Sequence, residues 1–239
     1  MAKSSKDRDR RAVYEEMRKK QAAKERRSTL VFTAAAVAVA VAILAIPVKS
    51  YLDDRRRDNR DLSDIGVPAA SAECQPVENK KVDLKIQPDG TYHVADGTDL
   101  EYPDGPPSFG LHWPNFLSGS EIRNIYSAGD RPPVERLVHS LEHGYTILWY
   151  DETIADDETA MSDLQGIADK YPVGDYLIIA PWEKDDGAAI PDNAHIALTH
   201  WRGKSEEGVS EYCGKVSGPV VQTFTDDYPK SDSPEPNAQ

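Results

Sequence analysis

The sequence of 239 residues is poor in basic side chains, with 28 Lys and Arg against 41 Asp and Glu and a formal net charge of −13. A protein that binds nucleic acid needs a basic surface to displace counterions from phosphates. The charge balance therefore excludes nucleic acid as a partner for the chain as a whole. The shortage is uneven, because residues 66–239 hold 12 basic and 31 acidic residues, whereas residues 1–27 hold 11 basic and 5 acidic ones.

Charged residues are absent from positions 28–48, which read STLVFTAAAVAVAVAILAIPV. A helix needs about 20 apolar residues to cross the hydrocarbon of a bilayer. The apolar part of a cleaved signal peptide is shorter, about 7–15 residues, and precedes a small-x-small cleavage site. No Ala-x-Ala directly follows this run, since Ala70-Ser71-Ala72 lies too far along the chain to be its cleavage site. The sequence therefore predicts an uncleaved transmembrane helix over residues 28–48 that contacts membrane lipid.

The distribution of Lys and Arg predicts the orientation of this helix. Residues 8–27 carry nine of them and residues 49–68 carry five. Because basic flanks stay preferentially in the cytoplasm, we expect a single-pass protein of the cell membrane with a cytoplasmic N-terminus and the C-terminal domain outside. The expected organisation is a basic cytoplasmic tail (1–27), a transmembrane helix (28–48), a juxtamembrane stalk (49–67), an extracytoplasmic domain (68–230) and a disordered tail (231–239).

Cysteine is nearly absent, since Cys74 and Cys213 are the only two. Without a Cys-x-x-Cys motif the pair is not expected to be a redox centre of the thioredoxin type. Both lie in the part of the chain expected outside the membrane, where the environment is oxidising. The sequence therefore predicts a structural Cys74–Cys213 disulfide.

The outer segment shows hydrophobic patterns of both helices and strands. Alternation followed by Asp89-Gly90 predicts a hairpin over Lys81–Val94. Periodicity and end signals predict three helices, at Pro133–His143, Asp156–Tyr171 and Val216–Tyr228. Short apolar runs predict three strands, at Tyr145–Tyr150, Tyr176–Ala180 and Ala194–Trp201. This mixed order predicts a single compact α+β layer domain.

Histidines form the most informative group of side chains. His139 and His143 are four residues apart on a predicted helix and so share a face. A helical wheel sets them opposite the apolar stripe of that helix. His112 follows a loop rich in proline and glycine and is expected to be the third ligand of a copper or zinc ion. Glu142 is expected beside the site, orienting the ligands, and His93 is expected either there or as a fourth ligand.

Two other functions remain open at this stage. The domain can be a structural or partner-binding module of a membrane complex, contacting another membrane or cell-envelope protein, with its histidines serving hydrogen bonds only. It can also be a metal-dependent hydrolase, because His139-Ser140-Leu141-Glu142-His143 matches the His-x-x-Glu-His motif of inverzincins, with Glu207 or Glu211 as a further ligand. The sequence assigns no catalytic residue, so enzymatic activity stays uncertain and no enzyme is predicted.

Three segments resemble a known bacterial family. They are Tyr102–Trp113 (YPDGPPSFGLHW), Arg136–Tyr150 (RLVHSLEHGYTILWY), and Ile196–Trp201 with the downstream Cys213. They are similar to a family of membrane proteins that carries the domain of unknown function 3105. The resemblance implies a single membrane span with an outer domain of this size, and it puts His112, His139, Glu142 and His143 at motif positions. It implies no reaction.

Overall fold

The computed structural model describes residues 3–58, 60–191 and 193–237. The chain divides into two compact units, residues 1–56 and residues 57–239, and each is described separately. The second unit combines a mixed β-sheet with helices and long ordered loops, which confirms the expected α+β class.

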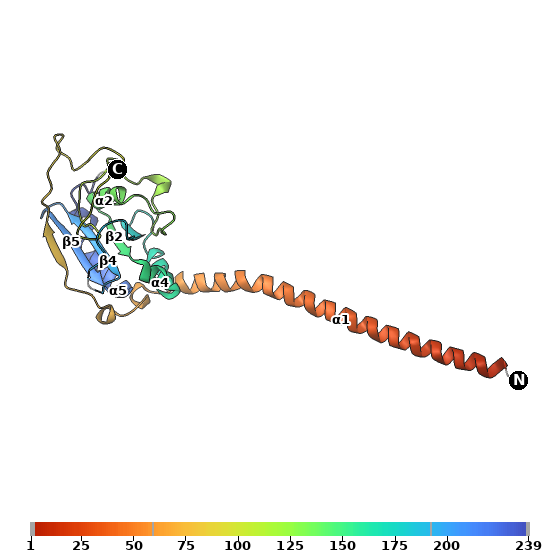
Figure 1. Cartoon of the computed structure of the whole chain (residues 1–239). Helices are drawn as coiled ribbons and strands as arrows, with labels where there is room; N and C mark the ends of the chain where they lie inside the picture. Colours follow the sequence, from red (N-terminus) through yellow and green to blue (C-terminus); the bar gives the residue numbers. More distant parts are fainter. Residues whose placement is uncertain (1–2, 59, 192, 238–239) are drawn as a thin grey trace. The chain divides into compact units, whose positions relative to one another are not determined.

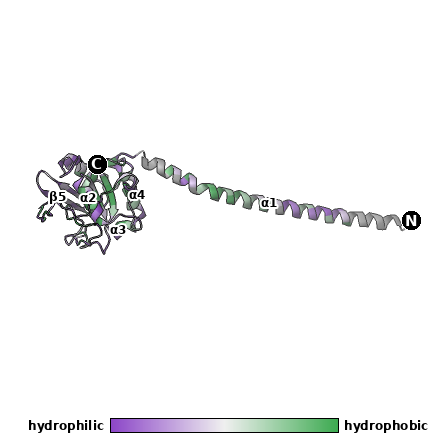
Figure 2. Ribbon diagram, turned by 90° about the horizontal axis from the view of Figure 1, so that it is seen from above, coloured by the Kyte–Doolittle hydropathy of each residue, from purple (hydrophilic) through white to green (hydrophobic). Residues whose placement is uncertain are grey.

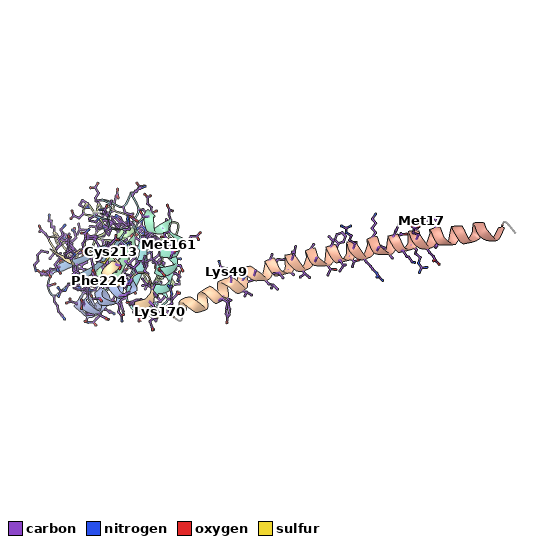
Figure 3. The ribbon with its side chains drawn as sticks, turned by 90° about the horizontal axis from the view of Figure 1, so that it is seen from below. Met17, Lys49, Met161, Lys170, Cys213 and Phe224 are labelled. Carbon is purple, nitrogen blue, oxygen red and sulfur yellow. A yellow bond between two sulfur atoms is a disulfide. The ribbon has the colours of Figure 1, made fainter. Side chains whose placement is uncertain are left out.

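The N-terminal unit consists of one helix, α1 (Lys3–Asp58), with Pro47 inside it. Within α1, Val13–Lys49 is long and apolar enough to cross a membrane, and none of its most apolar window is buried. Figure 2 shows this apolar stretch in green, with hydrophilic turns in purple on its N-terminal side. Side chains project from α1 all round between Met17 and Lys49 (Figure 3). The helix includes the predicted span, residues 28–48, and continues past it, so the first part of the predicted stalk is helical as well.

A five-stranded sheet organises the second unit, and three of its strands are labelled in Figure 1. The strand order is β1-β5-β4-β2-β3, for β1 (Glu78–Lys81), β2 (Thr146–Tyr150), β3 (Leu177–Pro181), β4 (Ile196–Arg202) and β5 (Glu207–Cys213). Only β2 and β3 run parallel, because α3 (Glu152–Ala155) and α4 (Glu158–Ala168) cross over between them. The other neighbouring strands pair antiparallel.

Each face of the sheet carries its own apolar core. On one face, Leu148 and Leu198 pack with residues of α4 and of α5 (Gly218–Asp227). On the other face, Trp149 and Trp201 pack with the apolar side of α2 (Val134–Glu142). Alternate residues of β2 thus belong to opposite cores, as the period of two of a strand requires. The second face, with α2 and the loops around it, holds most of the histidines.

The predicted hairpin over Lys81–Val94 is wrong in its pairing. Residues 87–91 do form a turn, with the Gln87 N–H donating to the Thr91 carbonyl at 2.8 Å. The strand before the turn, however, pairs with β5. The segment after it pairs with the loop around His112, since the Val94 N–H donates to the His112 carbonyl at 2.8 Å. Non-local backbone pairing therefore replaces the local hairpin.

Residues 231–237 also differ from the disordered tail predicted for residues 231–239, of which the last two lie outside the described residues. A short 3₁₀ turn, η4 (Lys230–Asp232), places this segment against the β4–β5 turn, where the Gly203 N–H donates to the Asp232 carbonyl at 2.7 Å. Ser233 is buried. The polar composition of the segment predicted disorder, but backbone hydrogen bonds to the domain order residues 230–237.

A disulfide joins Cys74 to Cys213 across 139 residues of sequence. Cys213 ends β5, beside the core that contains Phe224, and both residues are labelled in the body of the domain in Figure 3. Closing so long a loop reduces the conformational entropy of the unfolded chain.

We expect the double variant Cys74→Ala/Cys213→Ala to have a free energy of unfolding about 4 kcal/mol lower than that of the wild type. Tryptophan fluorescence during urea titration measures this unit alone, because the four tryptophans lie at positions 113, 149, 182 and 201. The wild type treated with a reductant should lose the same stability. Two free thiols in non-reducing peptide maps of the wild type would contradict the disulfide.

We expect His200 to make the stability of the domain depend on pH. It is fully buried on β4, and this burial lowers the pKa of its imidazole to about 4. The unfolded chain has the ordinary value near 6.5 and so binds the proton first as pH falls. The free energy of unfolding should therefore fall between about pH 6.5 and pH 4, by about 3 kcal/mol from this group.

Urea titrations of the full chain at pH 7 and pH 4, with a chelator present, measure this loss. His200→Phe, which cannot titrate, should lose correspondingly less stability than the wild type over the same interval. An equal loss in both proteins would show that His200 is not the group responsible.

Candidate metal centre

The C-terminal end of α2 supplies three side chains of the candidate centre. His143 is the C-terminal cap of this helix, and Gly144 follows in the left-handed region with a φ of 94°. A left-handed glycine is the usual residue after a helix end, because it has no Cβ to clash. The helix thereby presents His139, Glu142 and His143 in its last turn, as the sequence predicted.

All three of these side chains are buried, which the helical wheel did not predict. His139 is 2% exposed, Glu142 4% and His143 8%. The helical wheel set the two histidines opposite the apolar stripe, on the side of the helix where side chains are often exposed to solvent. The chain from Tyr92 to Phe116 covers that side of α2 instead, and the ring of Phe116 stacks on His143 with centroids 4.9 Å apart.

This covering loop supplies two more histidines. Residues 93 and 112 form an isolated parallel bridge, which sets the two rings 4.9 Å apart. His112 is fully buried and packs edge-on to Trp201 of β4. Gly110 is required nearby, since a Cβ there would lie 2.8 Å from the ring of Tyr102. The loop therefore holds His93 and His112 over the end of α2.

Three imidazoles converge on one carboxylate oxygen. Oε2 of Glu142 lies 3.0 Å from Nε2 of His112, 3.6 Å from Nε2 of His93 and 3.9 Å from Nε2 of His139. The donor atoms of these four residues all lie within 4.8 Å of one another. Four ligand atoms of this kind match the number and chemistry of a zinc or copper site.

Backbone carbonyls determine which ring nitrogens carry hydrogen. Nδ1 of His112 lies 2.8 Å from the Gly110 carbonyl, and Nδ1 of His139 lies 2.6 Å from the Trp113 carbonyl. A carbonyl only accepts, so both Nδ1 atoms donate. In each neutral ring the lone pair is then on Nε2, the atom that faces Glu142. This is the arrangement by which proteins orient metal-binding histidines.

Shifted pKa values favour neutral imidazole at His139 and His143 and ionised carboxylate at Glu142. Burial, followed by the neighbouring imidazole of His112, lowers the pKa of His139 to about 3. Burial also lowers the pKa of His143. For Glu142, burial alone would raise the pKa, but the hydrogen bond with His112, followed by the electrostatic interaction with the same ring, holds it below its ordinary value. Metal ions bind these protonation states.

The predicted ligands are only partly brought together. His112 and His139 lie in the group of four, as the sequence suggested. His93 joins them at the fourth position that the sequence left open, and Glu142 joins as a candidate ligand in place of the orienting role expected for it. The donor atom of His143 belongs to a neighbouring group with Glu142 and Glu235. Of the remaining histidines, His195 pairs with Asp151 at 2.8 Å and His200 lies 3.3 Å from the Thr146 hydroxyl.

The arrangement also differs from the inverzincin alternative. That alternative needs two helix histidines on one ion, a free glutamate and a distant glutamate ligand. Here Oε2 of Glu142 lies among the three imidazoles. Glu207 forms an ion pair with Lys81, and Glu211 lies beside the disulfide sulfurs, so neither belongs to a described group with a histidine.

Comparison with protein families identifies the domain. A family model described as "Protein of unknown function (DUF3105)" matches residues 93–239, which include all four residues of the cluster. This chain belongs to the DUF3105 family. The match excludes α1, so it confirms the resemblance to the family but not the single membrane span that the resemblance implied. No curated protein and no solved structure matches the chain.

Proposed function

We propose that this DUF3105 protein is a membrane-anchored, extracytoplasmic metal-binding domain, with zinc or copper held by His93, His112, His139 and Glu142. The observation that supports it most directly is the pair of backbone hydrogen bonds that direct the Nε2 lone pairs of His112 and His139 at the same carboxylate oxygen. A lone pair facing a carboxylate is repelled unless a proton or a metal ion lies between them.

Burial strengthens the proposal. Nε2 of His93 is buried and has no hydrogen-bond partner among the described residues. Leaving such an atom unsatisfied costs on the order of 1–3 kcal/mol. A divalent ion in the group of four satisfies this nitrogen and the Nε2 atom of His139 together. The excess of acidic residues over 66–239 adds a long-range attraction for cations.

Replacing one ligand should weaken binding strongly. In the full chain in detergent, His139→Gln and His112→Gln should each reduce the affinity of this position for zinc or copper by at least about 100-fold, more than the loss of an orienting partner usually causes. Equilibrium dialysis with elemental analysis measures the bound ion. His195→Gln is the matched control, since His195 is hydrogen-bonded to Asp151 outside the cluster, and it should bind as the wild type does.

One observation favours the structural alternative. His112 and Glu142 lie 3.0 Å apart in a buried position and can form a hydrogen-bonded ion pair without any metal. In that case the histidines serve stability and the domain acts as a partner-binding module of a membrane complex. A wild type that binds neither zinc nor copper at micromolar concentration, or a His139→Gln variant that binds both as tightly as the wild type, would overturn the proposed metal site and leave this alternative.

Anchoring by α1 is the second part of the proposal. Leu30 and Phe32 are 70% and 73% exposed, so the apolar window is not the core helix of a soluble fold within the described residues. A helix that is apolar all round needs an apolar solvent, and lipid provides it. The nine-to-five distribution of Lys and Arg favours a cytoplasmic N-terminus.

Protease added to spheroplasts that express the full chain should remove the C-terminal domain and leave an N-terminal epitope protected. Permeabilised cells, in which both ends are digested, serve as the control. Protection of the C-terminal domain in intact spheroplasts would contradict the orientation, and release of the chain by carbonate washing would contradict the anchor.

A further inference from the structure

His143 has an unexplained buried nitrogen. Its Nε2 atom has no hydrogen-bond partner among the described residues, although the residue is only 8% exposed. The ring lies beside His139, with centroids 4.6 Å apart, and Phe116 stacks on it with centroids 4.9 Å apart. Its donor atom lies within 4.8 Å of carboxylate oxygens of both Glu142 and Glu235. The His143 ring, which has one unpartnered nitrogen, thus lies close to two carboxylates.

Glu235 reaches this position because the C-terminal segment is attached to the end of α2. The backbone N–H of Glu235 donates to the Glu142 carbonyl at 2.9 Å, which satisfies one of the free carbonyls of the helix terminus. The segment also passes close to Gly144, where a Cβ would lie 2.6 Å from Lys230 and 3.0 Å from the Ser233 hydroxyl. The backbone therefore determines the placement of Glu235.

Glu142 lies between the two groups of ligands. Its Oε2 atom makes the three short contacts with His93, His112 and His139, so its other oxygen can serve a neighbouring ion. One carboxylate bridging two cations is a common feature of two-metal centres, in which the ions lie about 3.5–4 Å apart. Glu235 contributes a second negative charge, which offsets the repulsion between two neighbouring cations.

We propose that Glu142, His143 and Glu235 form a second divalent-cation position, adjacent to the first and sharing Glu142 with it. The inference rests on the proposed metal centre, because the bridging carboxylate belongs to both positions. One imidazole nitrogen and two carboxylate oxygens suit zinc, with room for water as a further ligand. Glu235 is exposed whereas the first group is largely buried, so the second ion should exchange with solvent more readily.

Zinc stoichiometry of the full chain in detergent tests the inference. After dialysis against zinc in excess, the wild type should hold two zinc ions per chain. Glu235→Gln and His143→Gln should each hold one, because each removes a ligand of the second position alone. Glu206→Gln is the matched control, since it removes an exposed carboxylate of the β4–β5 turn that belongs to neither group, and it should hold two.

Electron paramagnetic resonance provides a second measurement. In the copper(II)-loaded wild type, two ions bridged by Glu142 should give a spin-coupled signal, and Glu235→Gln should give the signal of an isolated ion. Tryptophan fluorescence at matched urea concentrations verifies that the variants remain folded.

The outcomes separate the two proposals. A wild type that holds one zinc ion, lost in His139→Gln and retained in Glu235→Gln, overturns the second position and leaves the first in place. Two zinc ions in Glu235→Gln and in His143→Gln would also overturn it. A wild type that holds no zinc and no copper would overturn both proposals.

Discussion

The candidate centre depends on two hydrogen bonds from histidine rings to backbone carbonyls, His112 to Gly110 and His139 to Trp113. Each bond uses the Nδ1 proton and so leaves the lone pair on Nε2. Both carbonyls belong to the same covering loop, within four residues of sequence. Loop conformation therefore determines the ring orientation of a loop histidine and of a helix histidine at once. Any change that moves residues 110–113 therefore changes the directions of the Nε2 lone pairs of both His112 and His139.

The sheet provides the rigid support that this loop requires. Trp201 of β4 packs against the ring of His112, and Tyr102 donates its hydroxyl hydrogen to the Leu111 carbonyl at 2.9 Å. The apolar side of α2 is buried against the same face through Leu137 and Leu141. Helix and loop are thus fixed to one common surface, and their facing polar side chains are largely buried. Functional groups held in this way keep their geometry better than groups on free loops.

Local signals in the sequence were sufficient for much of the fold. Short apolar runs identified β2, β3 and β4, and Pro133 and Gly144 marked α2 closely, because those signals act within a few residues. Strand β5 was missed, since Val209 and Cys213 share their face with Glu207 and Glu211 and neither face is uniformly apolar. The spacing of His139 and His143 was informative, but a helical wheel contains no information on what covers the polar side. Non-local pairing of residues 93 and 112 brought His93 into the cluster, and no local pattern encodes that pairing.

A count of protons shows why an ion pair alone does not complete the cluster. One proton on Nε2 of His112 satisfies the 3.0 Å contact with Glu142. The low pKa of His139, about 3, withholds a second proton at neutral pH, so its Nε2 lone pair stays directed at a carboxylate 3.9 Å away. Nε2 of His93, 3.6 Å from the same oxygen, is buried without a hydrogen-bond partner in the described part of the chain. A single divalent cation would replace the proton on His112 and would satisfy all three nitrogens and the carboxylate, whereas a proton satisfies only one pair.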